Sequence, residues 1–277
     1  MTDRNHTASG RDAAGQPAYG GQAYGGQAYG DEANGNSPYG TPGYGDAAGK
    51  SAASAVPVEV SSRGLPEWLR PVHEAAGTVE ASQLSRFLPP PDGGGRPSAV
   101  LVLFGEGADG PELLLIQRAS SLRSHAGQPS FPGGSVDPED GDPQGDGRLR
   151  AALREAEEET GLDPAGVQVF GVLPSLYIPV SGFVVTPVLG WWHTPSPVAP
   201  VDPAETARVF TVPITELSDP ANRAMAVHPA GHVGPAFLVG PALVWGFTAG
   251  VIDRLLHYAG WERPWDRDRR VPLDWHA

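Results

Sequence analysis

The sequence predicts an α/β (α+β) domain with a mixed central sheet between helical layers, preceded by a disordered N-terminal tail. An amphipathic helix is expected over 148–160, because one side is apolar and the other carries carboxylates. Short apolar runs indicate buried strands. Strands interleaved with helices favour a mixed sheet covered by helices. The expected strands cover 99–104, 113–116, 167–173, 183–191 and 209–212, and a strand ending at 237–239 precedes a buried helix over 242–258.

Residues 1–60 are predicted to be a disordered, low-complexity tail rich in Gly, Tyr, Gln and Ala. Gly-Gln-Ala-Tyr-Gly occurs twice over 21–30, and five of the seven tyrosines of the chain lie in this tail. Such a segment has too few aliphatic residues to form a core. The domain is expected to span 61–265, with short helices near 64–88 covering one edge, and a C-terminal extension to span 266–277.

Composition excludes several classes of protein. The chain has 277 residues, a formal net charge of −13 and no cysteine, so disulfides, thiolate zinc sites and cysteine nucleophiles are excluded. An acidic chain lacks the field that gathers nucleic acid polymers. The longest apolar stretch, 237–252, is interrupted by Gly and Pro and is shorter than the ~20 residues of a membrane span. No apolar signal segment follows the polar start, so a cytoplasmic location is expected.

The acidic side of the expected helix carries three glutamates. Glu155, Glu158 and Glu159 are three and four residues apart, so they share one face and their carboxylates are expected to converge. Oxygen ligands of this kind favour Mg²⁺ or Mn²⁺. The alternative is an ordinary solvated acidic face. Gly161 is suited to end the helix in the left-handed conformation.

This helix and the glycines before it resemble the box of the Nudix hydrolases. That box consists of a glycine, five residues, an acid, seven residues, and then Arg-Glu-apolar-x-Glu-Glu-x-Gly-apolar, and its second half matches from Arg154 to Leu162 without a gap. Counting from Gly134, Asp140 takes the position of the first acid, but thirteen residues separate it from Arg154. The inserted 141–147 has turn-forming composition and enlarges a loop at little entropic cost. Asp146 is the alternative first acid.

The resemblance implies a Nudix-type α/β/α sandwich whose loop and helix carry the catalytic residues. Glu158 and Glu159 would then be ligands of Mg²⁺ or Mn²⁺, and Glu155 a ligand or the general base. Arg154 would orient a carboxylate. Glu205 matches an acid that completes the metal set or acts as base in such enzymes, and an exposed turn acid is the alternative.

A second resemblance covers the segment before the box. Residues 114–134 are similar to the signature of coenzyme A pyrophosphatases, which has Leu-Leu, an Arg, a second Arg five residues on, a Gly four residues later and then Phe-Pro-Gly-Gly. Ile116 departs from the usual Ser or Thr. The resemblance implies hydrolysis of coenzyme A or acyl-coenzyme A to 3′,5′-ADP and 4′-phosphopantetheine or its acylated form. The residues expected to bind the substrate are Arg118, Arg123, His125, Gly133 and Gly134.

The two arginines have a physical reason to bind phosphate. The apolar run 113–116 indicates a strand that delivers Arg118 and Arg123 to the loop beyond its end. Guanidinium groups pair with phosphate oxygens in bidentate fashion, and each such contact is worth about 1.5–3 kcal/mol. Surface ion pairs, worth about 0–1 kcal/mol, are the alternative. The acidic helix beside them favours phosphate contacts.

Other substrates and assemblies stay open at this point. The box specifies the reaction and not the leaving group, so ADP-ribose or NADH is an alternative substrate. A noncatalytic ligand sensor on the same fold is the alternative from another class of protein. The presence of all three box glutamates argues against a sensor. Trp265 and Trp275 follow the last helix and are expected to dock on the domain or on a second subunit, which leaves a homodimer open.

Overall fold

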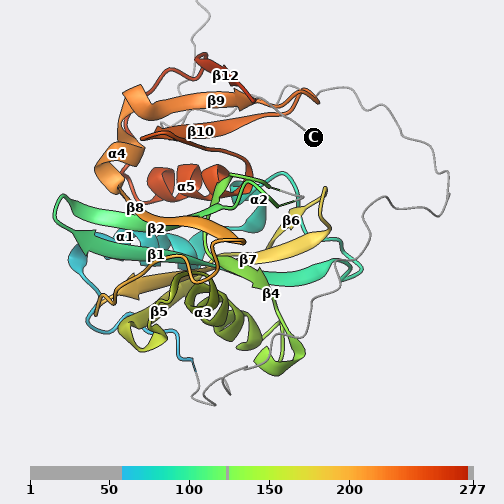
Figure 1. Cartoon of the computed structure of the whole chain (residues 1–277), viewed down its shortest axis with the longest axis vertical. Coiled ribbons are helices and arrows are strands. Elements are labelled where there is room, and N and C mark those ends of the chain that lie inside the picture. The colour runs from blue at the N-terminus through green and yellow to red at the C-terminus, as the bar shows by residue number, and fades with distance from the viewer. Residues whose placement is uncertain (1–57, 123–124, 274–277) are drawn as a thin grey trace, which may run out of the picture. The chain divides into compact units, whose positions relative to one another are not determined.

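A mixed eight-stranded sheet forms the centre of the folded domain (Figure 1). The computed structural model describes residues 58–122 and 125–273, so the tail prediction for 1–57, Arg123 and Trp275 lie outside the described residues. The strands of this sheet are β1 (Arg96–Gly107), β2 (Gly110–Arg118), β3 (Pro129–Ser130), β4 (Gly133–Ser135), β5 (Val167–Val172), β6 (Leu176–Ile178), β7 (Phe183–Trp192) and β8 (Thr206–Pro213). β1 and β7 run parallel, whereas β2 is antiparallel to β1 and β8. The predicted mixed sheet is confirmed.

The central strands bury side chains on both faces. Along β1, Leu101 and Leu103 enter one core, whereas Val102 and Phe104 enter the core on the opposite face. This alternation follows from the two-residue period of a strand. Because both faces are covered, these strands are continuous apolar runs in the sequence. The strands predicted over 99–104, 113–116, 183–191 and 209–212 lie within β1, β2, β7 and β8, and the strand predicted over 167–173 extends one residue beyond the end of β5.

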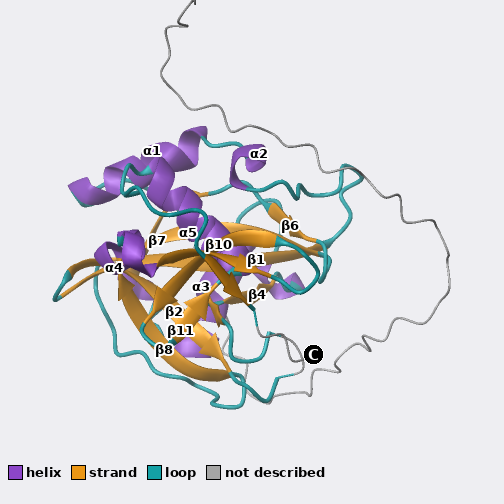
Figure 2. Ribbon diagram, turned by 90° about the horizontal axis from the view of Figure 1, so that it is seen from above, coloured by secondary structure: helices purple, strands orange, loops and turns teal. Residues whose placement is uncertain are grey.

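Helices cover both faces of the central sheet (Figure 1). They are α1 (Arg70–Thr78), α2 (Ala81–Leu84), α3 (Gly147–Thr160), α4 (Ile214–Ser218) and α5 (Gly246–Tyr258), with 3-10 helices η1 (Glu67–Leu69), η2 (Pro138–Asp140), η3 (Pro164–Gly166) and η4 (Pro220–Asn222). The predicted amphipathic helix is α3, and its Leu149 and Leu153 pack with Leu101 of β1. α5 and α1 contribute Ile252 and Val72 to the other core. The short helices α1 and α2 follow one edge of the domain (Figure 2).

A second, four-stranded sheet covers α5 on the side away from the central sheet (Figure 1). Its strands are β9 (Arg223–Val227), β10 (Val233–Val239), β11 (Ala242–Val244) and β12 (Arg270–Pro272). The sequence reasoning foresaw only the end of β10. The predicted start of the last helix at 242 is wrong, because 242–244 pair with β10 as a strand and the helix begins at Gly246. Within the described part of the chain, no helix combines the length and apolar character needed to cross a membrane.

Both ends of the described chain contact the domain. Val58 packs against the core beneath α3, and the Ser61 N–H donates to the Val169 carbonyl over 2.9 Å. At the other end, β12 pairs in parallel with β9. The Trp265 ring lies 4.4 Å from the guanidinium carbon of Arg223, so Trp265 contacts the domain, which is one of the two docking partners expected for it.

Glu262 links the end of α5 to the C-terminal segment. Its carboxylate lies 2.8 Å from His257 Nδ1 and accepts hydrogen bonds from Trp265 Nε1 over 3.2 Å and from Arg267 over 2.8 Å. Burial alone raises the pKa of Glu262, but these hydrogen bonds and the charge of Arg267 outweigh it and hold the pKa below its usual range. The ionised carboxylate therefore stabilises the folded state.

Glu262→Gln is expected to lower the free energy of unfolding at pH 7 by about 1 kcal/mol or less, since the ion pair between Glu262 and Arg267 is near the surface. A carboxylate whose pKa falls on folding contributes its full stabilisation above its unfolded pKa and loses it as pH falls through the folded pKa. The difference between wild type and variant should therefore shrink below about pH 4. Urea unfolding between pH 7 and pH 3 measures it. A difference that grows on acidification would contradict this account.

Candidate active site

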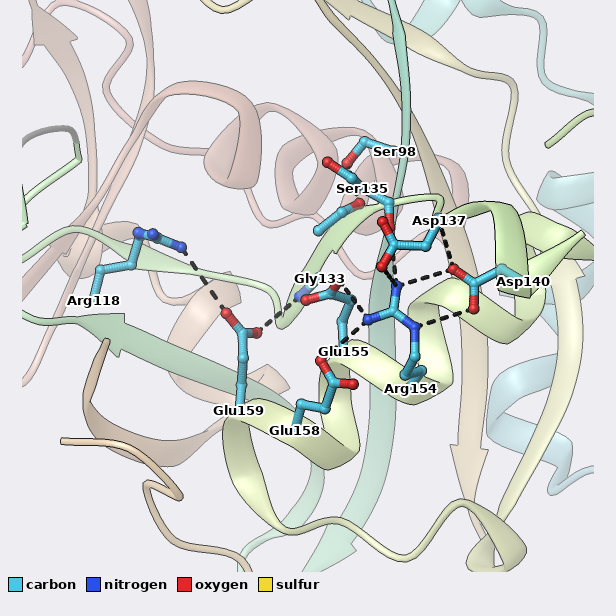
Figure 3. Close-up of polar contacts among 11 residues, drawn as sticks. Ser98, Arg118, Gly133, Ser135, Asp137, Asp140, Arg154, Glu155, Glu158 and Glu159 are labelled. Atoms are coloured by element: carbon cyan, nitrogen blue, oxygen red, sulfur yellow. Dashed lines mark hydrogen bonds and ion pairs between the residues drawn. The ribbon is translucent and has the colours of Figure 1, made fainter. Parts of the chain in front are cut away.

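Arg154 lies at the centre of a polar network between α3 and the loop before it (Figure 3). Its guanidinium donates to both carboxylate oxygens of Asp140, over 2.9 and 3.1 Å, and to the Ser135 carbonyl over 3.1 Å. The remaining terminal nitrogen donates to Glu155 over 2.8 Å and to Glu158 over 3.1 Å. Charge-assisted contacts of this kind fix the direction of side chains. Arg154 therefore orients two of the three glutamates, as the resemblance implied for one.

Asp140 occupies the position of the first acid in spite of the inserted residues. Its side chain is 1% exposed and accepts both hydrogen bonds from Arg154. Asp146 is 57% exposed and lies 3.9 Å from Arg150. Of the two candidates, Asp140 is therefore the one that contacts Arg154.

The glycine pair allows β4 to pass between β1 and α3. A Cβ atom on Gly133 would lie 2.4 Å from the Ala99 carbonyl oxygen, and one on Gly134 would lie 2.5 Å from the carboxyl carbon of Glu155. The Gly133 N–H donates to Glu159 over 2.9 Å. A side chain at either position would thus displace β1 or a glutamate. In this structure the two glycines position the carboxylates.

Burial raises the pKa of Glu159 to about 8, although the Gly133 N–H and the Arg118 charge oppose this shift. The negative charges of Glu155 and Glu205 raise it further. Burial in a site of like charges disfavours ionisation, and a bound cation removes that penalty.

Glu155 is subject to the same two effects. Burial raises its pKa most, Arg154 opposes the shift, and Glu158 adds to it. Burial lowers the pKa of Arg154, but its contacts with Asp140 and Glu155 outweigh burial and the net pKa is raised. The guanidinium is therefore a permanent positive charge beside the carboxylates.

The end of β2 brings Arg118 close to α3 (Figure 3). A terminal nitrogen of Arg118 lies 3.9 Å from a carboxylate oxygen of Glu159. The next residue, Ala119, donates its N–H to the Glu205 carbonyl over 2.8 Å, so the chain around Glu205 joins the same place. The structure thus gathers Arg118, Glu159 and Glu205, which come from three distant parts of the sequence.

Of the two remaining residues predicted to bind substrate, the structure describes His125 but not Arg123. His125 is exposed, has a positive φ of 56°, and its Nδ1 lies 3.0 Å from Gln128 Oε1. Arg123 lies outside the described residues. A phosphate contact by either residue stays a prediction.

The chemistry of the glutamates fits a divalent cation, but their arrangement corrects one expectation. Across residues 58–122 and 125–273, no three histidine or acidic side chains are grouped so that they could hold a metal ion. The expected convergence of three carboxylates is therefore not observed, because Arg154 binds Glu155 and Glu158 while Gly133 binds Glu159. The donors themselves are oxygens, which Mg²⁺ and Mn²⁺ prefer. Burial of Glu155 and Glu159 is a penalty that a cation offsets, whereas Glu158 is exposed.

Sequence reasoning did not single out Arg150, which also contacts the site. Its Nε donates to the Asp140 carbonyl over 2.6 Å. The signal that could have found it is its position four residues before Arg154, on the same side of the helix.

Comparison with known proteins identifies the family to which the chain belongs. A model of the NUDIX domain matches residues 95–233, half of the chain. The uncharacterized Nudix hydrolase NudL of Cronobacter sakazakii is 41% identical over 157 residues, which cover 56% of this chain and 78% of that protein. NudL of Citrobacter koseri is 41% identical over 152 residues, covering 52% and 73%. The crystal structure of the Nudix hydrolase RenU of M. smegmatis has a TM-score of 0.42 and 19% identity, and the match covers 62% of this chain and 90% of that one. The chain therefore belongs to the Nudix family of hydrolases, which act on nucleoside diphosphate derivatives and generally need divalent metal ions.

Proposed function

We propose that this hydrolase cleaves the diphosphate of coenzyme A or acyl-coenzyme A, giving 3′,5′-ADP and 4′-phosphopantetheine or its acylated form. The observation that carries the proposal is the 3.9 Å approach of Arg118 to Glu159. It places the segment that resembles the coenzyme A pyrophosphatase signature directly beside the box glutamates. A substrate diphosphate held by this segment would therefore be next to the carboxylates that act on it.

The box supplies the groups that hydrolysis of a diphosphate requires. Glu155, Glu158 and Glu159 would hold Mg²⁺ or Mn²⁺, which when bound neutralises phosphate charge and activates a water. Arg154 keeps Glu155 and Glu158 in place through its two hydrogen bonds. The oxygen of water adds to one phosphorus, the bond from that phosphorus to the bridging oxygen breaks, and Glu155 or Glu205 accepts the proton of the water.

Substrate specificity is proposed to lie in the segment before the box. Arg118, Arg123 and His125 provide cationic or hydrogen-bonding groups for the diphosphate and for a further phosphate such as the 3′-phosphate of coenzyme A. Gly133 and Gly134 leave room for the backbone to pass close to the reacting groups. An acidic chain needs such local cations, because its overall charge of −13 repels a polyanion.

A panel of substrates tests the proposal. The full chain is incubated with Mg²⁺ or Mn²⁺ and, separately, coenzyme A, acetyl-coenzyme A, NADH and ADP-ribose, and the products are separated by chromatography. We expect 3′,5′-ADP from both coenzyme A compounds, with kcat/KM at least about tenfold above those for NADH and ADP-ribose. Preference for ADP-ribose or NADH would replace the proposed substrate. Turnover of no diphosphate would favour a ligand sensor.

Arg123→Ala is expected to raise KM for coenzyme A about tenfold or more, with kcat little changed. The reason is that loss of a ground-state phosphate contact, worth about 1.5–3 kcal/mol, weakens binding without changing the chemical step. Steady-state kinetics with coenzyme A and with a coenzyme A analogue lacking the 3′-phosphate measure it. A variant that loses kcat rather than KM would place Arg123 in the chemical step instead.

A further inference from the structure

Arg150 fastens the inserted part of the box to the catalytic helix. Its Nε donates over 2.6 Å to the carbonyl of Asp140, the residue just before the inserted segment 141–147. Its guanidinium lies 3.9 Å from the carboxylate of Asp146, the next-to-last residue of that segment. A Cβ atom on Gly141 would lie 2.9 Å from a terminal nitrogen of Arg150, so the guanidinium also packs closely on the first inserted residue. One side chain thus contacts both ends of the inserted segment.

Asp140 is held at two separate groups by two arginines of α3. Arg154 binds its carboxylate over 2.9 and 3.1 Å, and Arg150 binds its carbonyl. The two arginines are four residues apart and therefore project from the same side of the helix. Asp140 as a whole is 2% exposed, so losing the Arg150 contact would leave its buried carbonyl without this donor or allow the residue to move.

The inserted segment folds back on itself between these contacts. The Asp142 carbonyl accepts hydrogen bonds from the N–H groups of Gly145 and Gly147, over 3.0 and 2.9 Å. A Cβ atom on Gly147 would lie 2.5 Å from that same carbonyl oxygen, so the return to the helix is tight. The extra residues therefore form a closed turn, and Arg150 joins this turn to the helix.

We propose that Arg150 is a positioning residue that keeps Asp140, and through it Arg154 and the glutamates, in place although thirteen residues, rather than the seven of the box, separate Asp140 from Arg154. Without a fixed attachment, a longer loop samples more conformations and holds Asp140 less firmly. Arg154 would then lose the partner that directs its other nitrogens toward Glu155 and Glu158. This inference rests on the proposed assignment of those glutamates as metal ligands.

Arg150→Met tests the inference, since methionine keeps the apolar length of the side chain and removes its donors. Mn²⁺ binding is measured first, by electron paramagnetic resonance on the full chain without substrate, and kcat and KM for coenzyme A are measured next. We expect the Kd for Mn²⁺ to rise about 10- to 100-fold and kcat to fall by a similar factor. KM should change less than about twofold. Arg150→Lys, which restores a donor and a charge, should recover part of both losses.

Arg148→Ala is the matched control, because Arg148 lies on the same helix turn and, in the described residues, its Nε has no hydrogen-bond partner. It should bind Mn²⁺ as the wild type does. Wild-type Mn²⁺ affinity in folded Arg150→Met would overturn the inference, as would equal losses in Arg150→Met and Arg150→Lys. If the wild type does not hydrolyse coenzyme A, the proposed substrate is wrong. The Mn²⁺ measurements still decide the role of Arg150 in that case. Thermal unfolding identifies a variant that fails to fold, in which case the Mn²⁺ affinity of Arg150→Lys relative to the wild type decides.

Discussion

Replacing Glu159 by glutamine is expected to lower kcat for the diphosphate substrate about 100-fold or more. A metal-held phosphate or water accounts for several kcal/mol of transition-state stabilisation, and each 1.36 kcal/mol corresponds to a factor of ten in rate. Glu159 is the glutamate that both Arg118 and the Gly133 N–H approach, so it joins the segment proposed to bind the substrate to the box. Its loss should therefore affect metal binding and phosphate placement together.

The same variant should retain or gain stability, which separates catalysis from folding. Burial raises the pKa of Glu159 to about 8, so holding its charge in the folded state is unfavourable at neutral pH. A glutamine keeps an oxygen that can accept from the Gly133 N–H and carries no charge. Urea unfolding should give a free energy at least equal to that of the wild type. Glu157→Gln, on the exposed side of the same helix, is the control and should keep wild-type kcat. Glu159→Gln with kcat within about twofold of wild type would contradict the metal assignment.

The strands and helices that surround the site were predictable because their signals are local. The strands over 99–104 and 113–116 are continuous apolar runs, and α3 has both its apolar stripe and Gly161 as its end signal. Gly161 is indeed left-handed, with a φ of 70°. The sequence predicts helix over β11 because its three residues are continuous with the apolar stretch of α5, and periodicity cannot separate a short strand from a buried helix turn. The second sheet depends on pairing between strands, which no single segment reveals.

For α3, the sequence predicted which residues share a face but not which residues they contact. Spacing placed Glu155 and Glu158 on one side of α3, where both reach Arg154. The choice of Asp140 over Asp146 depends on how the inserted loop folds back, and loop length alone does not determine that. The approach of Arg118 to Glu159 joins β2 to α3, so it exists only in the tertiary structure.

The largest effect on stability is expected at a buried ion pair beneath the second sheet. Arg223, at the start of β9, is 0% exposed and donates to Asp253 of α5, which also accepts from Arg254. The Phe237 and Trp265 rings lie 4.5 and 4.4 Å from its guanidinium carbon, on which cation–π attraction acts. Burial lowers the pKa of Arg223 although the Asp253 charge opposes this shift. The Arg223 Nε and one terminal nitrogen have no hydrogen-bond partner among the described residues, so Asp253 provides its principal compensation.

Asp253→Ala is therefore expected to lower the free energy of unfolding by about 3–5 kcal/mol, because it leaves a buried guanidinium without its carboxylate. For a domain of this size that corresponds to a fall in Tm of roughly 10 °C. Calorimetry measures the fall in Tm, and urea unfolding the free energy. Arg254→Ala, which removes the partly exposed partner, should cost about 1 kcal/mol.

The double variant Arg223→Met with Asp253→Leu distinguishes a lost charge pair from a simple cavity. Apolar side chains of similar volume replace a buried ion pair at little or no cost in many proteins, because neither charge has to leave water. The double variant should therefore recover most of the stability lost in Asp253→Ala. Since this pair lies on α5 and β9 rather than on α3, kcat and KM should remain near wild type in both folded variants. A double variant as unstable as the single one would show that the packing of Arg223 between the two rings, rather than its charge partner, stabilises the attachment of the second sheet.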